Sequence, residues 1–316
     1  MEHPFRGRKV RPFTIEIAAL VGAGAGGGAF ADLTFPALSP RLADLAAPWF
    51  AIGAFSYGAP AGLALGWRSP SDFAQLMSIM VAPSFRGQGL AARLLGEWEK
   101  AAARLGATRV CACHSTRTKQ GAAFEAALAR AGWPAPQLHG LHLIGEAGAL
   151  AEAVAQWPGV RGRLTDSQIS TFDTWTTLTA VDRAAIERLK AESGIRPDIA
   201  IQQYEAALDP VCSVIVRRRG EVVGWIFAEP VRQLPIRGYD DRVARFYPVA
   251  YIAKSVQHTG IMIAGFWHAY SRQAAAYGCG SLVVYRTSTP GFMQLTRRLA
   301  PIAIRVDEIF ESIKKL

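Results

Sequence analysis

Hydrophobic and polar positions follow the same order in two parts of the chain. In the first half, residues 49–55 read as a strand, residues 57–61 as a turn and residues 62–67 as the returning strand. In the second half, residues 211–216 and 223–228 repeat the pattern around a glycine turn. Short apolar runs bounded by glycine turns predict antiparallel hairpins. We therefore expect one β-hairpin in each half.

A strand, a glycine-containing turn and a long amphipathic helix follow each hairpin. The predicted strands are 75–81 and 249–256, and the predicted helices are 87–105 and 260–277. Gly106 and Gly278 stand where C-terminal helix caps are expected, and each precedes a further apolar strand, at 108–113 or 281–285. A strand–helix–strand connection of this length gives parallel strands with a right-handed crossover. Each half is therefore predicted to be α/β, with a mixed sheet flanked by helices.

The two halves align at an offset of 171 residues, the separation of Arg86 and Gln257. The same offset carries Thr116-Arg117-Thr118 onto Thr287-Ser288-Thr289 without a gap. Self-similarity on this scale indicates a duplicated domain. Between the halves, Pro158 ends a short helical pattern and a polar stretch follows. We place the boundary near residue 155, which gives domains of residues 1–155 and 156–316.

Composition and charge narrow the class of protein. Of the 316 residues, 50% are hydrophobic and 19% are charged, as in globular proteins. Thirty-five Lys and Arg against 25 Asp and Glu give a formal net charge of +10, which favours anionic partners such as nucleic acid or phosphorylated cofactors. The densest basic cluster, Arg217-Arg218-Arg219 beside Gly220, is interpreted as a solvated hairpin turn.

The cysteines and the apolar runs bear on metal binding and location. The four cysteines (Cys111, Cys113, Cys212 and Cys279) are too few for a disulfide framework and have no C-x-x-C spacing. We predict no metal site and a reducing, cytoplasmic location. The basic N-terminus with the apolar stretch after it is similar to a signal peptide, but Glu16 and the glycines at 22–28 argue against one. No run of about 18 uninterrupted apolar residues predicts a membrane helix.

The segment 81–91, V-A-P-S-F-R-G-Q-G-L-A, lies between the predicted strand and helix of the first half. The small residues Gly87, Gly89 and Ala91 allow a ligand to approach the backbone closely. Successive amides and the dipole of the helix N-terminus attract anions. The segment lacks both the G-K-[ST] ending of a Walker A loop and the G-x-G-x-x-G of a dinucleotide fingerprint. The sequence therefore predicts a pyrophosphate site of another kind.

This segment resembles the R-x-x-G-x-[GA] signature of the GNAT superfamily of acyl-CoA-dependent N-acyltransferases, matched at Arg86, Gly89 and Ala91 with the V-x-P-x-x-R-G-x-G extension. The order of the elements is also that of the family, and residues 121–133 look like its later helix ending in a G-[FW] pair. The resemblance implies two tandem GNAT-like domains that use acetyl-CoA or another acyl-CoA. It also implies main-chain contacts from Ile79 and Val81 to the pantetheine arm, and a pyrophosphate site formed by Arg86, Gly87, Gln88, Gly89, Leu90 and Ala91.

The catalytic residues are less clear from the sequence, because many family members carry a proton-donating tyrosine where this chain has Leu128. The other polar groups near the predicted opening between the parallel strands are Ser78, His114 and Ser115. His114 is the candidate general base, because an imidazole accepts protons at neutral pH and strand ends carry the sites of α/β sheets. A histidine that ends a strand is also commonly a packed structural residue, and serines are common at strand ends.

The second half keeps Gln257 and Gly260 of the signature but has Met262 where the family has Gly or Ala. A methionine there is expected to obstruct a pyrophosphate, so we interpret the second domain as degenerate and as a wall of the substrate cleft. Four aromatic residues are candidates to line that cleft, or else belong to the core: Tyr285, which matches His114 at the same offset, Trp225, Phe266 and Trp267.

The sequence thus predicts an acyltransferase that N-acetylates a small-molecule or peptide amine by direct attack on the thioester. An aminoacyl-tRNA-dependent transferase on a similar tandem fold would suit the charge of +10, but such enzymes typically lack the turn that is intact here. A non-catalytic CoA-binding or scaffold protein is favoured by Leu128 and by the changed second turn. Nucleic acid is expected as a partner only as tRNA under the first alternative, and no membrane is expected.

Overall fold

The computed structural model describes residues 14–20, 27–43, 45–157, 160, 162, 170–193, 205–231, 239 and 241–316. The chain divides into two compact units: Met1–His139 with Ile309–Leu316, and Gly140–Glu308. Two strands, β6 (Gln137–Glu146) and β14 (Arg305–Lys315), begin in one unit and end in the other. The compact units are therefore not contiguous in sequence, and the domain boundary near residue 155 stays a proposal based on the repeat.

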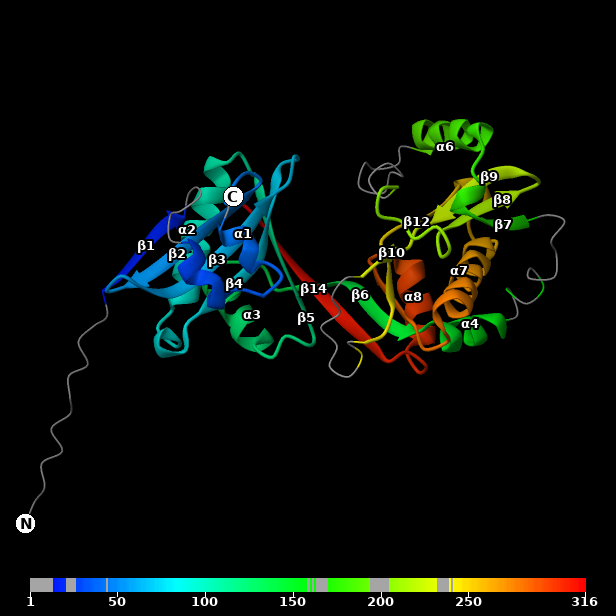
Figure 1. Ribbon diagram of the computed structural model, residues 1–316. Coiled ribbons are helices and arrows are strands. Elements are labelled where there is room, and N and C mark those ends of the chain that lie inside the picture. The colour runs from blue at the N-terminus through cyan, green and yellow to red at the C-terminus, as the bar shows by residue number, and fades with distance from the viewer. Residues whose placement is uncertain are drawn as a thin grey trace, which may run out of the picture. The chain divides into compact units, whose positions relative to one another are not determined.

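The first unit is built on a sheet with the strand order β1, β2, β3, β4, β5 and β14 (Figure 1). Its first five strands are β1 (Ile15–Leu20), β2 (Trp49–Ser56), β3 (Ala59–Arg68), β4 (Phe73–Val81) and β5 (Arg109–Ser115). Only β4 and β5 pair in parallel, and the other neighbours are antiparallel. The hairpin and the parallel pair predicted for the first half are confirmed.

Helices cover both faces of this sheet. They are η1 (Gly27–Leu33), α1 (Ser39–Ala43), η2 (Pro83–Phe85), α2 (Leu90–Arg104) and α3 (Gly121–Arg130). One face, here called the α2 face, buries Leu94, Leu95 and Trp98 of α2 against strand residues that include Val110 and Ala112. The opposite face, here called the η1 face, buries a second cluster that includes Phe30, Leu42, Leu63 and Leu65. Each strand side chain can therefore be assigned to one of two faces.

The parallel strands of the first unit open at their carboxyl ends. β4 pairs with β3 up to Val81, with a register shift at Leu65/Gly66, but its register with β5 ends at Leu76–Ala112. Beyond that point β5 pairs with β14 on its other side, up to Ser115. In the described part of the chain, the edge of β4 at residues 77–81 therefore has no strand partner on the β5 side.

The second unit contains two sheets. The first has the order β6, β13 (Leu282–Thr287), β11 (Ala244–Tyr247) and β10 (Glu229–Pro230), and the second has β12 (Ala250–Ile252), β9 (Glu221–Ile226), β8 (Val214–Arg218) and β7 (Ser170–Thr174). Its helices are α4 (Ala147–Ala155), η3 (Trp175–Thr177), α6 (Ala180–Ser193), η6 (Lys254–Val256), α7 (Ile261–Tyr277) and α8 (Pro290–Leu299). The predicted second hairpin is confirmed as β8 and β9.

The strand predicted at 249–256 is confirmed only for Ala250–Ile252 (β12), and the strand that pairs in parallel with β13 is β11, which ends before Pro248. β11 ends at Tyr247 and pairs with β13, whereas β12 pairs with β9 of the other sheet. Proline has no N–H to continue a ladder, so the chain changes its partner there. Residues 254–256 form a 3₁₀ turn instead.

The offset of 171 residues holds up to the start of the helix and fails after it. α2 and α7 begin at Leu90 and Ile261, but α2 has 15 residues and α7 has 17. The last parallel pairs are Leu76–Ala112 and Tyr247–Tyr285, so Tyr285 corresponds to Ala112 rather than to His114. The ungapped match of the threonine segments is therefore not a structural match.

The final strands of the two halves are exchanged. β6, at the end of the first half, pairs antiparallel with β13 in the second unit. β14, at the end of the chain, pairs antiparallel with β5 in the first unit. Each unit is therefore completed by a strand from the other half of the sequence, which the sequence pattern did not reveal.

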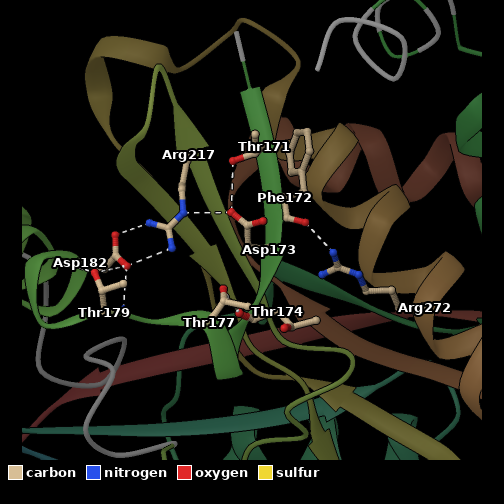
Figure 2. Close-up of polar contacts among 9 residues, drawn as sticks. All are labelled: Thr171, Phe172, Asp173, Thr174, Thr177, Thr179, Asp182, Arg217 and Arg272. Carbon is tan, nitrogen blue, oxygen red and sulfur yellow. Dashed lines mark hydrogen bonds and ion pairs between the residues drawn. The ribbon is translucent and has the colours of Figure 1, made fainter. Parts of the chain in front are cut away.

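The basic cluster at 217–219 is only partly solvated. Arg217 lies on β8 with 12% of its side chain exposed, and its Nε donates to Asp173 Oδ2 at 2.9 Å (Figure 2). Its two Nη groups contact the carboxylate of Asp182, which also accepts from the backbone and hydroxyl of Thr179 in a capping box that starts α6. The interpretation as a solvated turn is wrong for Arg217, because its ion pairs tie α6 to the sheet, and fits the exposed Arg219.

Candidate functional site

The turn between β4 and α2 forms a concave run of backbone amides. Gly87 and Gly89 have φ of 78° and 75°, in the left-handed region that favours glycine. A Cβ added to either glycine would meet no atom within 4 Å, so the space above the turn is open. The first helical hydrogen bond runs from Arg93 N–H to Gly89 O at 3.2 Å, so the preceding amides lie outside the helical ladder. This arrangement suits a phosphate group.

The side chains of the turn hold its shape. Arg86 is exposed, and its Nε donates to the carbonyl of Val81 at 2.9 Å. Gln88 Nε2 donates to Ser84 O at 3.4 Å. Leu90 is buried against the core, whereas Ala91 is only half-buried. The turn thus combines an anchored backbone with one exposed positive charge.

The open edge of β4 presents the main chain of Ile79 and Val81. Ala82 N–H donates to Ala61 O in β3 at 2.9 Å. Main-chain groups alternate from side to side along a strand, so those of Ile79 and Val81 point away from β3. Their side chains pack against the α2-face core. An extended ligand running along this edge toward the turn would find backbone donors and acceptors in the manner of an added strand.

The three polar candidates from the sequence lie on different faces of the sheet. Ser78 is buried and pairs with Leu65, whose side chain belongs to the η1-face core. Ser115 alternates with His114 along β5 and so also points to the η1 face, whereas His114 is on the α2 face with Val110 and Ala112. The structure therefore brings the two serines to one side of the opening and His114 to the other.

His114 forms a dyad with a residue that the sequence analysis did not single out. Its Nε2 lies 2.8 Å from Glu125 Oε1 on α3, and only 7% of its side chain is exposed. The ring stacks on Phe310 of β14 at 5.7 Å and meets Phe124 edge-on at 5.5 Å. Nδ1 is buried and has no hydrogen-bond partner in the part of the chain that the structure describes. Leu128, at the position of the usual tyrosine, is buried in the core.

The turn of the second unit repeats the backbone of the first. Ala82 and Ala253 both have φ of −58° and ψ of 142°, and Gly260 (φ 81°) corresponds to Gly89. His258, with φ of 61°, stands where the first turn has Gly87, so an exposed side chain is added there. Met262 is half-buried and packs against the core of the unit.

The aromatic residues considered for a cleft in the second half are mostly core residues. Trp225, Phe266 and Tyr285 are at most 3% exposed, and Tyr285 Oη lies 3.1 Å from Thr296 Oγ1. Trp267 is half-buried against the same core. The expectation that the first three line a cleft is wrong, because their rings fill the interior of the unit.

Among the described residues, no group of His, Cys, Asp and Glu is arranged to hold a metal ion. Within the same part of the chain, every helix is too short or too polar to cross a bilayer.

Comparisons with known proteins agree with this geometry. Residues 27–128 match the model of the acetyltransferase (GNAT) family. A tandem GNAT protein from the clavulanic acid biosynthesis pathway is 13% identical, with a TM-score of 0.63 over 96% of this chain and 98% of that one. A GCN5-related N-acetyltransferase from Sphaerobacter thermophilus is 16% identical, with a TM-score of 0.59 over 95% of each chain. No curated protein matches the sequence.

The chain is therefore a tandem GNAT-fold protein. Its first unit carries a GNAT acetyltransferase domain, which is the domain of an acyl-transferring enzyme. The second unit keeps the backbone of the signature turn with a changed sequence.

Proposed function

We propose that this chain is an acyl-CoA-dependent N-acetyltransferase that acts on a small-molecule or peptide amine. The observation that carries the proposal is the continuity of the β4 edge at 77–81 with the glycine turn at 86–91, both in the first unit. An extended thioester cofactor with a pyrophosphate at one end matches an open strand edge followed by a concave run of amides.

Each part of this site has a role in the proposal. The main chain of Ile79 and Val81 holds the pantetheine arm, and the turn from Arg86 to Ala91 holds the pyrophosphate. Acyl-CoA supplies the activated acyl group when it is bound. The carbonyl carbon would then lie in the opening between β4 and β5, where Ser78 and Ser115 approach from the η1 face and the His114–Glu125 dyad from the α2 face. An amine must lose a proton to attack, and His114 is the proposed acceptor of that proton.

One alternative differs from this proposal in its ligand, and the other differs in having no activity. An aminoacyl-tRNA-dependent transferase is favoured by the net charge of +10, and a non-catalytic CoA-binding protein by the buried Leu128. A thermal-shift comparison of acetyl-CoA, longer acyl-CoAs and tRNA tests the tRNA-dependent alternative, because a ligand that binds the native state raises its melting temperature. Release of CoA thiol in the presence of an amine tests the non-catalytic alternative, which binds CoA without turnover. Stabilisation by tRNA and not by acetyl-CoA would contradict the proposal.

Changing Gly89 to valine is expected to weaken acetyl-CoA binding at least tenfold, or about 1.4 kcal/mol. A β-branched residue is strained at the φ of 75° that Gly89 adopts, so the amides would turn away from the phosphate. Isothermal titration calorimetry checks the affinity. Gly96→Val in α2, the helix that Gly89 caps, is the matched control. A Cβ on Gly96 would also meet open space, but Gly96 does not have a positive φ. Equal affinity in both variants would move the cofactor site away from this turn.

One acetyl-CoA per chain is the expected stoichiometry. In the second turn His258 adds a side chain at the position of Gly87, and the strand before it pairs over only three residues. The same titration gives the stoichiometry. Gly260→Val is expected to leave the affinity close to that of the unmodified chain, since this change falls on the turn proposed not to bind. A stoichiometry of two would contradict the degenerate role of the second unit.

A further inference from the structure

A small cavity in the first unit lies where β6 begins beside β14. Its volume is about 240 Å³, and its lining includes Pro134, Leu138, His139, Glu311 and Ile313. Leu138 and Ile313 are 39% and 47% exposed, so they offer apolar surface to a ligand. Glu311 and His139 supply the ionisable groups. The cavity is therefore apolar on its sides with one carboxylate in its wall.

Glu311 lies close to the opening between β4 and β5. It pairs with Cys113, the residue that follows the last β4–β5 pair, Leu76–Ala112. Because cross-strand partners share a face, Glu311 points to the η1 face together with Cys113 and Ser115. The carboxylate is thus one strand away from the place proposed for the thioester, on the same face as both serines.

Among the residues that the structure describes, the carboxylate of Glu311 has no permanently charged partner. Its Oε1 accepts from Cys113 Sγ at 3.8 Å, and its Oε2 lies 3.0 Å from His139 Nδ1. By contrast, Glu99 in the same unit lies 2.7 Å from the ammonium of Lys314. A carboxylate accepts about four hydrogen bonds, so Glu311 can receive further donors through its 21% exposed surface. Its negative charge is available to a ligand cation.

We propose that Glu311 binds the ammonium group of the acceptor and that the cavity beside it holds the apolar group of the same acceptor. The preferred acceptor is then a primary amine with an aromatic or aliphatic group, rather than an acid or a small polar amine. This inference rests on the proposed function and assigns the recognition of the acceptor to a residue of the last strand. A charge-assisted hydrogen bond to a half-buried carboxylate distinguishes an ammonium from a neutral or anionic isostere.

The test uses the full chain, acetyl-CoA and two probe amines, phenethylamine and methylamine, with release of CoA thiol as the readout. The unmodified chain is expected to acetylate phenethylamine with a KM at least tenfold below that for methylamine. Glu311→Gln is expected to raise the KM for phenethylamine at least tenfold and to change kcat little. Glu97→Gln, which removes a carboxylate paired with Lys100 on α2, is the matched control. Calorimetry with acetyl-CoA should give the same affinity for all three proteins.

The outcomes separate this inference from the proposed function. If Glu311→Gln keeps the KM of the unmodified chain, the acceptor site is elsewhere and this inference fails alone. If acetyl-CoA binds but neither amine is acetylated, the non-catalytic alternative replaces the proposed function and this inference falls with it. If the two amines have the same KM, the apolar wall has no role and the proposal fails. If acetyl-CoA does not bind at all, the proposed function falls first and this inference falls with it. An Ile313→Thr variant adds a second check, with an increase in KM expected for phenethylamine alone.

Discussion

Replacing His114 with alanine is expected to lower kcat about 100-fold and to leave the affinity for acetyl-CoA near that of the unmodified chain. The imidazole is held by Glu125 at Nε2 and by two aromatic rings, which leaves Nδ1 as the nitrogen without a partner among the described residues. A histidine fixed by a carboxylate at one nitrogen has the other available to accept a proton. Steady-state rates with phenethylamine and calorimetry with acetyl-CoA together measure the effect.

Glu125→Gln provides the control for this prediction. Glutamine can keep a hydrogen bond to Nε2 but removes the charge that stabilises an imidazolium, so a smaller loss of kcat is expected. His114 also packs on Phe310 and Phe124, so thermal unfolding must show that His114→Ala remains folded. A folded His114→Ala variant with unchanged kcat would assign the dyad a purely structural role.

The local pattern of the sequence was sufficient for the signature turn. Alternation and glycine spacing predict the hairpins, the strand before the turn and the helix after it, because these depend on neighbours in the sequence. The left-handed conformations of Gly87 and Gly89 follow from the same local signals. The repeat likewise placed the second turn, where Ala253 and Gly260 have nearly the backbone angles of Ala82 and Gly89.

The surroundings of the candidate site could not be predicted in the same way. Glu311 and Phe310 reach β5 only because β14 joins the sheet of the first unit, and that pairing connects residues about 200 positions apart. Residues 305–315 do not alternate, because their apolar residues recur three and four positions apart, as in a helix. The sequence therefore predicts neither this strand nor the strand that it joins. The face of each β4 side chain also depends on the register shift at Leu65/Gly66, which has no clear signal in the sequence.

The cluster around Arg217 illustrates the same limit for stability. Three consecutive arginines beside a glycine turn predict solvated charges. The carboxylates that pair with Arg217 belong to Asp173 on β7 and Asp182 on α6, which are 44 and 35 positions away in the sequence. A non-local partner changed the environment of one arginine and left the exposed Arg219 as predicted. The two positions therefore offer a matched pair for experiment.

Arg217→Met is expected to lower the free energy of unfolding by about 3 kcal/mol, because it leaves the largely buried Asp182 without its cation. The side chain of Asp173 is 37% exposed and is solvated when Arg217 is removed, so the loss of the Arg217–Asp173 ion pair adds little to the destabilisation. Arg219→Met is expected to change stability by less than about 0.5 kcal/mol, as is usual at exposed positions. Urea unfolding of the two variants measures both effects. Similar destabilisation by both changes would contradict the assignment of Arg217 as a buried anchor of α6.

The ion pair between Arg217 and Asp182 also predicts how the free energy of unfolding depends on pH. Burial alone raises the pKa of Asp182, but hydrogen bonds from Arg217 and Thr179 outweigh it and lower the pKa from 3.8 to about 2. A carboxyl group whose pKa is lowered by folding stabilises the native state fully above its unfolded pKa, and this contribution is lost as the pH falls through the folded pKa. The free energy of unfolding should therefore fall by about 2 kcal/mol more between pH 4 and pH 2 in the unmodified chain than in Asp182→Asn. Parallel curves for the two proteins would mean that Arg217 does not stabilise the charged form of Asp182.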